Sequence, residues 1–208
     1  MIKANHHPFF VWFFRLYTNI MIRIHFRKVY VEGDTEKTTN PLLVVSNHFS
    51  WWDGFFIFWL NNKFWKKIFY VMMLEEQLAI RKFLSRTGAF SIKRGQTSDR
   101  HSLRYATEIL QNNENLLLMY PQGEIRSQLE YPVHFKNGAE FLIKSSQPEV
   151  KMVVVLTDYF SFRKPSLFFY IKNVDPQNEE IKPEALFNNF MHESIEKQKA
   201  KAKAISDH

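Results

Sequence analysis

A histidine and an aspartate, His48 and Asp53, stand five positions apart behind the apolar run at residues 42–45. A neutral imidazole can take a proton from a hydroxyl near pH 7, and a carboxylate can orient the ring and stabilise its charged form. On one helix five residues turn through about 500°, so these side chains would not share a face. They meet only if His48 lies on a strand-to-helix turn, where open α/β sheets place their sites, and Asp53 lies in the first helical turn. A His beside Trp is also often a packed surface residue, so the pair needs support from other segments.

The composition narrows the chemistry that this pair can serve. The 208 residues suit one α/β domain, or one domain with a short appendage, and 45% apolar residues suffice for a core. The net charge of +7 favours an anionic partner such as nucleic acid, anionic lipid or a phosphorylated substrate. Cysteine is absent, which excludes disulfides, thiolate nucleophiles and Cys-ligated metals. Acyl or phosphoryl chemistry must therefore use an oxygen or nitrogen nucleophile, or direct transfer between two substrates.

Residues 8–27 predict an N-terminal helix with two faces. Arg15, Asn19, Arg23 and Arg27 recur every four residues as a basic stripe, and mostly aromatic and aliphatic residues cover the rest. The helix either packs on the domain core or lies in the headgroup layer of a membrane, with its arginines on phosphates. No run is long enough to span a bilayer and no signal-peptide cleavage site follows. We expect a protein kept in the cytoplasm, peripheral or monotopic at the cytoplasmic face of the membrane.

The rest of the chain alternates between strand and helix patterns. We expect strands at residues 28–32, 42–46, 68–73, 90–93, 115–120, 150–156 and 167–173, and helices at 54–60, 75–86, 98–111, 136–145 and from 183. This alternation predicts one α/β domain with a mostly parallel or mixed sheet flanked by helices. We assign residues 1–27 to the N-terminal membrane-interface helix and residues 28–208 to the α/β domain.

Three further segments carry charges after or beside predicted strands. Arg94 lies at the cationic end of one strand, and such an end is either solvated surface or an anion clamp. Glu124 and Arg126 lie on a loop that proline and glycine turn away from the next strand, where a local ion pair is the simplest interpretation. Lys136 opens a helix whose N-terminal dipole favours an anion.

In this order, the segments resemble the glycerolipid acyltransferase superfamily, which includes bacterial lysophosphatidic acid acyltransferases. The first motif of that superfamily, Asn-His, four residues and Asp, is matched by residues 47–53, and its Gly-x-Phe/Ile-x-Ile-x-Arg strand by residues 88–94. The third motif, Phe-Pro-Glu-Gly-Thr-Arg-Ser followed by Phe-Lys-x-Gly, is similar to residues 120–127 and 135–138. The fourth, a Val-Pro-Val strand, corresponds to residues 153–155 without the proline.

The third motif departs from the superfamily at three places. Gln122 stands where the superfamily has glutamate, Glu124 stands where it has threonine, and Ile125 moves Arg126 one position later. In the superfamily this motif helps to hold the phosphate of the acceptor. An acceptor with a different head group, such as an aminolipid or a glycolipid, therefore stays open beside a lysophospholipid-like acceptor.

The resemblance implies an O-acyltransferase of phospholipid biosynthesis, similar to the 1-acylglycerol-3-phosphate acyltransferases. His48 would be the general base and Asp53 its orienting partner, moving a fatty acyl group from acyl-CoA or acyl carrier protein to a hydroxyl. We expect no cofactor and no metal. Backbone groups around Gly123 are candidates to stabilise the oxyanion, and Trp51, Trp52 and residues 55–60 to line the acyl groove. The candidate substrate-binding residues are Arg94, Gly123, Glu124, Arg126 and Lys136.

Two other classes of protein stay open. A nucleic-acid-binding protein fits the basic charge, but the aromatic residues gather in apolar runs and no recognition module occurs, so we expect no nucleic acid partner. A non-catalytic membrane-surface protein on the same scaffold fits the altered third motif, whereas the intact His48–Asp53 pair argues against it. The expected partners are a lipid acceptor, a thioester donor and a membrane surface.

Overall fold

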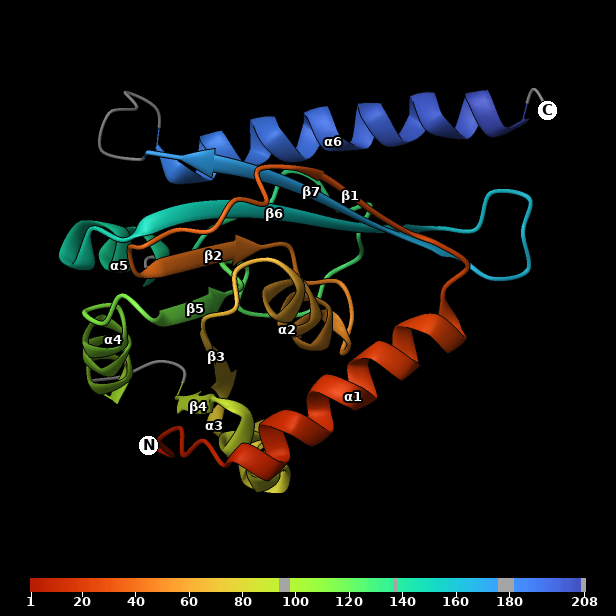
Figure 1. Ribbon diagram of the computed structural model, residues 1–208. Coiled ribbons are helices and arrows are strands. Elements are labelled where there is room, and N and C mark those ends of the chain that lie inside the picture. The colour runs from red at the N-terminus through yellow and green to blue at the C-terminus, as the bar shows by residue number, and fades with distance from the viewer. Residues whose placement is uncertain (94–97, 137, 176–181, 207–208) are drawn as a thin grey trace.

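The computed structural model describes residues 1–93, 98–136, 138–175 and 182–206, and among them seven strands form one sheet (Figure 1). The strands are β1 (Val29–Gly33), β2 (Leu42–Ser46), β3 (Ile68–Leu74), β4 (Ala89–Ile92), β5 (Asn115–Met119), β6 (Glu149–Asp158) and β7 (Ser166–Val174). The helices are α1 (Pro8–His25), α2 (Asp53–Lys63), α3 (Glu75–Ile80), the 3₁₀ helix η1 (Lys82–Thr87), α4 (Ser98–Ile109), α5 (Gly138–Ser146) and α6 (Pro183–Ser206).

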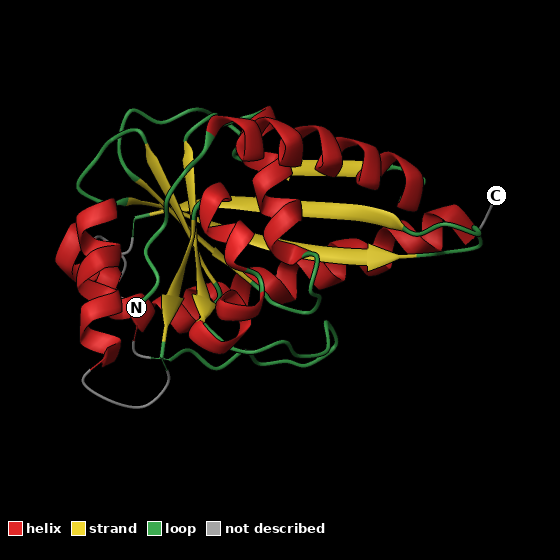
Figure 2. Ribbon diagram, turned by 90° about the horizontal axis from the view of Figure 1, so that it is seen from below, coloured by secondary structure: helices red, strands yellow, loops and turns green. Residues whose placement is uncertain are grey.

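The sheet is mixed, with the order β1-β7-β6-β2-β5-β3-β4. The five strands from β6 to β4 run parallel, whereas β7 is antiparallel to β6 and carries β1 parallel to itself. Helices lie on both faces of the sheet (Figures 1 and 2), and every residue of β2 and β5 is buried. Strands covered on both faces are apolar along their whole length, which explains the unbroken apolar runs at these positions. The expected α/β class with a mixed sheet is confirmed.

The sheet separates two layers of core. On one face α4, α5 and α6 contribute residues such as Ile109, Leu142 and Phe187, and on the other α1 and α2 contribute Met21 and Ile57. Figure 1 shows α6 above β7 and β1, with α2 and α1 below the sheet. The site described below therefore lies on a framework whose two faces are both packed.

Helix α1 packs on α2 through one side and exposes apolar residues on the other. Phe14, Thr18, Met21 and Ile22 are buried in the same core as α2. The opposite side, here called the apolar face of α1, exposes Phe9, Trp12, Phe13, Leu16, Ile20 and Ile24. Within the described part of the chain, no helix has both the length and the apolar character needed to cross a bilayer.

The segment at residues 75–86 departs from the single helix that the sequence predicts. The structure divides it into α3 and η1, with Arg81 between them in a non-helical conformation. Residues 1–7 lie against this region, because Asn5 N–H donates to Ser85 O at 2.9 Å and His7 N–H donates to Arg86 O at 3.0 Å. These two bonds attach residues 1–7 to the C-terminal part of η1, where Ser85 O also accepts the N–H of Gly88 at 3.3 Å.

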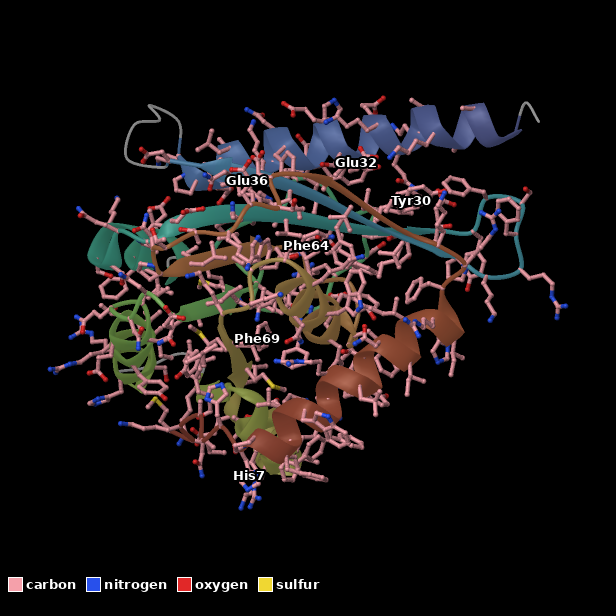
Figure 3. The ribbon with its side chains drawn as sticks, viewed as in Figure 1. His7, Tyr30, Glu32, Glu36, Phe64 and Phe69 are labelled. Atoms are coloured by element: carbon pink, nitrogen blue, oxygen red, sulfur yellow. The ribbon has the colours of Figure 1, made fainter. Side chains whose placement is uncertain are left out.

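Near the C-terminal end of α6, Lys201 contacts side chains of β1 and β7. Lys201 pairs with Glu32 of β1, and its ammonium lies 5.5 Å from the ring centre of Tyr30 and 5.3 Å from that of Tyr170. Figure 3 shows Tyr30 and Glu32 beneath α6. A cation over aromatic faces and beside a carboxylate is stabilised by both, so this contact holds the helix end over the sheet.

Candidate active site

The turn after β2 is fixed by an asparagine that bridges two strands. Asn47 donates from Nδ2 to Val155 O at 2.8 Å and accepts the Val155 N–H on Oδ1 at 2.8 Å. The side-chain amide thus imitates a peptide group and extends the pairing of β2 with β6 by one residue. Because Asn47 is buried and doubly bonded, the backbone that carries His48 begins from a defined position.

His48 and Asp53 meet as their spacing predicts, on the turn and in the first turn of α2. The distance from His48 Nδ1 to Asp53 Oδ2 is 2.8 Å, and the same carboxylate oxygen accepts the N–H groups of Phe49 and Ser50 at 2.7 and 2.8 Å. Burial raises the pKa of Asp53 above its usual value, while the bonds from His48, Ser50 and Phe49 act to lower it. With Nδ1 bound to the carboxylate, the other ring nitrogen of His48, Nε2, has no hydrogen bond to the part of the chain that the structure describes and can face a substrate.

Tyr120, at the end of β5, stacks on His48. The two ring centres are 4.1 Å apart and the planes differ by 12°. The Tyr120 hydroxyl is buried and has no hydrogen-bond partner among the described residues. Burial, followed by the negative charge of Asp53, raises the pKa of Tyr120 well above its usual value, so the phenol stays neutral. The expectations from the sequence did not include this contact.

The loop after Tyr120 holds both peptide groups of His48. The His48 N–H donates to Gln122 Oε1 at 2.6 Å, and the Arg126 N–H donates to the His48 carbonyl at 2.9 Å. A glutamate at position 122, as in the superfamily, would offer the same acceptor oxygen with a charge. Glutamine therefore keeps the hydrogen bond that positions His48 and omits one negative charge from a partly buried site.

A cavity of about 910 Å³ opens beside His48. Its wall is mostly apolar and comes from α1, α2, β3, η1 and β4, with Phe14, Phe55, Phe58, Phe69 and Leu84 among the lining residues. A volume of this size accommodates a long apolar ligand chain. Charged residues reach the wall at Lys93, Glu124 and Lys136.

The expectation that residues 51–52 and 55–60 line the groove is met in part. Trp51, Phe55 and Phe58 do line the cavity. Phe56, Ile57 and Leu60 point instead into the core between α2 and the sheet, where each is almost fully buried. A helix that is apolar all round presents one side to the cavity and another to the core, and the sequence alone does not assign the sides.

Gly123 and Lys136 lie against each other at the cavity wall. Gly123 has a φ of 69°, and a Cβ atom there would come within 2.9 Å of Lys136 Nζ and 3.0 Å of its Cδ. Both the left-handed backbone and the close lysine require glycine at this position. The Gly123 N–H donates to Tyr120 O at 3.0 Å, so the turn already uses one of the backbone groups around Gly123 that were expected to stabilise an oxyanion.

Arg126 is held by two carboxylates beside the site. Its Nη2 lies 2.5 Å from Glu124 Oε1, and its Nη1 lies 3.0 Å from Glu130 Oε1. These bonds, chiefly the one from Glu124, raise the pKa of Arg126. Arg126 is exposed and is not among the residues that line the cavity, whereas Glu124 is. Arg94, the other arginine expected to bind substrate, lies outside the described residues.

Comparison with known proteins identifies the family. The chain matches the Acyltransferase family over residues 28–156, more than half of its length, and it belongs to that family. This match confirms the resemblance to the glycerolipid acyltransferase superfamily. No curated protein sequence matches the chain.

A solved structure with a similar fold is the 1-acyl-sn-glycerophosphate (LPA) acyltransferase PlsC from Thermotoga maritima. The two chains share 18% sequence identity with a TM-score of 0.64, over 90% of this chain and 78% of that chain. At this identity the likeness concerns the fold. The arrangement of β2, the turn and α2 that presents His48 therefore sits on an architecture that a lipid acyltransferase also uses.

Proposed function

We propose that the protein transfers a fatty acyl group from acyl-CoA or acyl carrier protein to a hydroxyl of a lysophospholipid-like acceptor. The observation that carries this proposal is the 2.8 Å contact between His48 Nδ1 and a buried Asp53 at the mouth of a large apolar cavity. The contact fixes the ring and leaves Nε2 for the acceptor, and the cavity supplies room for an acyl chain. The family match supports an acyltransferase, and this geometry supports the role that we propose for His48.

In the proposed reaction, His48 Nε2 takes the proton of the acceptor hydroxyl, and the oxygen of that hydroxyl attacks the carbonyl carbon of the thioester. The carbon–sulfur bond of the tetrahedral intermediate then breaks, and the leaving thiolate receives the proton from His48 Nε2. Asp53 accepts a hydrogen bond from Nδ1–H throughout and stabilises the imidazolium. Because the acyl group passes directly between substrates, no covalent enzyme intermediate is needed, in keeping with a chain without cysteine.

Lys136 is our candidate for the positive charge near the reacting groups. Its side chain lines the cavity, and it forms no ion pair with any residue that the structure describes. An ammonium at this place suits either a phosphate of a substrate or the oxyanion of the intermediate.

A second candidate acceptor carries no phosphate. The observation that favours it is the ion pairing of Arg126 with Glu124 and Glu130, which balances the charge that the superfamily motif offers to a phosphate. An aminolipid or a glycolipid bearing a hydroxyl would place amine or hydroxyl groups near Glu124 instead. Both candidates use the same base and the same acyl donor.

We also propose that the protein works as a peripheral or monotopic protein at the cytoplasmic face of the membrane. The apolar face of α1 exposes two phenylalanines, a tryptophan and three aliphatic residues, and the neighbouring Trp51 is 46% exposed. A helix with this pattern lies in the interface with its apolar side towards the acyl chains. Lipid acceptors would then reach the cavity from the bilayer.

The test of the function is His48→Ala with a matched control. The variant should lose at least about 100-fold in acyl transfer, because a positioned base contributes about 10² to 10⁴. His101→Ala removes an exposed histidine from α4 and should leave the rate unchanged. Labelled acyl thioesters, a panel of lysolipids and mass spectrometry of the products would measure transfer and identify the acceptor.

Circular dichroism would check that the His48→Ala variant keeps its fold. If that folded variant retained more than about a tenth of the rate, His48 would not be the base. If the wild-type protein transferred acyl groups to none of the acceptors, the non-catalytic interpretation of the scaffold would stand.

A further inference from the structure

A second cavity, of about 570 Å³, lies between α1, α2 and the start of β1. Five cations line it, namely Arg15, Arg23, Arg27, Lys28 and Lys63, and no carboxylate does among the residues that the structure describes. Among the residues that the structure describes, none of the five forms an ion pair with Asp or Glu. We call this cavity the basic cleft. Like charges held together without counter-charge create a positive potential that attracts an anion.

The basic cleft is preformed by contacts between the two helices. Arg15 Nε donates to Asn62 Oδ1 at 3.1 Å, and Trp59 Nε1 donates to Asn19 Oδ1 at 2.9 Å. Lys63 Nζ lies 5.0 Å from the ring centre of Trp59, which holds a second cation over an aromatic floor. An anion entering this cleft would therefore meet cations that are already gathered, which lowers the ordering cost of binding.

The basic cleft is separate from the catalytic cavity. The two sets of lining residues have no member in common. Helix α2 stands between them, because Phe55 and Phe58 face the catalytic cavity whereas Trp59 and Asn62 face the basic cleft. A ligand in the basic cleft is thus neither the acyl chain nor the group that reacts at His48.

The position of the basic cleft relative to α1 indicates what fills it. Arg15, Asn19 and Arg23 are four residues apart, so they form one stripe along the helix. This stripe borders the apolar face of α1, which begins at Phe9 and ends at Ile24. A phosphate in the cleft would therefore lie beside the side chains that suit acyl chains, which is the arrangement of a phospholipid at a membrane surface.

We propose that the basic cleft binds the phosphate head group of an anionic phospholipid of the membrane, as a site apart from the acceptor. An acidic protein such as an acyl carrier protein would satisfy the cations but would leave the bordering apolar face in water. A bilayer provides both the negative charge and the apolar phase. Held at the cleft and at the apolar face, α1 has one fixed rotation about its own axis at the membrane.

The test removes two cations from different helices. In Arg23→Gln/Lys63→Gln neither residue loses a hydrogen bond to the described protein, so the fold should persist, as a thermal melt would verify. The matched control, Arg104→Gln/Lys144→Gln, removes the same charge from α4 and α5, where both residues are exposed. Co-sedimentation would compare vesicles of phosphatidylcholine with vesicles of phosphatidylcholine and phosphatidylglycerol.

We expect the cleft variant to bind the anionic vesicles about 30-fold more weakly, because each cation near an anionic surface contributes about 1 kcal/mol and about 1.4 kcal/mol is tenfold. The control variant should change by less than about threefold, and both should bind pure phosphatidylcholine as the wild type does. The charge-preserving variant Arg23→Lys/Lys63→Arg should keep the binding to anionic vesicles.

Two results would overturn the proposal. Equal losses in the cleft and control variants would mean that overall charge, not this cleft, attracts the membrane. Unchanged vesicle binding in the cleft variant would remove the cleft from the membrane contact, and weaker binding of acyl carrier protein by that same variant would then assign the cleft to the donor. Because vesicle binding needs no acyl transfer, His48→Ala should bind like the wild type, and the outcome does not depend on the proposed reaction.

Discussion

If Asp53 orients His48 as proposed, its catalytic role and its contribution to stability oppose each other. The side chain is fully buried, and burial is the largest influence on its pKa, which is raised. A carboxyl whose pKa is higher in the folded state costs stability as the pH rises from the unfolded value through the folded value. Above that window the ionised carboxylate lowers the stability of the fold, and in the proposed reaction it is the anionic partner of His48.

We therefore expect Asp53→Asn to lower kcat by about 10- to 100-fold, less than the loss of the base itself, without lowering the melting temperature at pH 7. The neutral amide removes the penalty of burying charge but no longer fixes the ring or stabilises the imidazolium. Melting curves from pH 3 to 7 would check the sign, since the stability of the wild type should fall relative to the variant as the pH rises. A variant that melts lower than the wild type at pH 7 would refute this account.

The ion pair with Glu124 partly neutralises the charge of Arg126 and so limits how strongly Arg126 can attract an acceptor phosphate. If the acceptor carries a phosphate, Glu124→Gln should lower the apparent KM for that acceptor by a few fold, because one of the two carboxylates that hold Arg126 loses its charge. The control Glu130→Gln removes the other carboxylate, which is not on the cavity wall, and should have a smaller effect. Steady-state kinetics with a lysophosphatidate and with a neutral lysolipid would distinguish an acceptor that carries a phosphate from one that does not. A rise in KM of the Glu124→Gln variant only for the neutral lipid would favour a head group that Glu124 binds.

The sequence predicted the contact between His48 and Asp53, but it did not predict the residues that hold this pair in place. The His48–Asp53 contact could be predicted because its two residues are close in the chain and can meet in one way only. Asn47 bonds to a residue 108 positions away and His48 to a residue 74 positions away, and no local pattern contains those partners. Tyr120 could have been proposed from its place in the third motif, but stacking depends on the order of β2 and β5 in the sheet.

At the scale of elements, most helices and strands lie where apolar periodicity and turn residues predict them. The predicted strand at residues 42–46 agrees with β2, and the helix expected at 8–27 ends at His25. The region 75–86 contains no proline or glycine, so its sequence gives no sign of the break at Arg81. The contacts from residues 1–7 reach Ser85 and Arg86 of η1, and no local pattern in residues 75–86 indicates these contacts with a distant segment.

The proposed binding of α1 to the membrane is tested better by substituting exposed residues than by deleting the helix. Removing residues 1–26 would remove the apolar face of α1 but would also uncover the core that Phe14, Met21 and Ile22 fill. Trp12→Ser/Ile20→Ser changes only exposed side chains, and we expect it to weaken vesicle binding at least tenfold with an unchanged melting temperature, because each loses about 2 kcal/mol of apolar burial in the membrane. Phe14→Ala should do the opposite and lower the melting temperature. Vesicle binding unaffected by the double substitution would place the anchor elsewhere, for instance at Trp51.

For the whole molecule, the alternation of patterns predicted the α/β class but not the order of the strands. The pairing of β2 with both β5 and β6 joins segments that are far apart in the chain. The reversal at β7 follows from its short connection to β6, which permits an antiparallel pair, whereas a parallel neighbour needs a longer crossover. This arrangement brings the end of β2 beside the loop after β5, and the site exists only because those two ends are adjacent.

The closeness of the apolar face of α1 to the wall of the catalytic cavity has a consequence for how rate depends on lipid composition. Phe14, on the same helix, lines that cavity. If the protein lies in the membrane interface as proposed, it meets a lipid acceptor by diffusion in two dimensions. Its rate then follows the mole fraction of acceptor within the surface, and diluting the acceptor with inert lipid slows the reaction even when the bulk concentration of acceptor is unchanged.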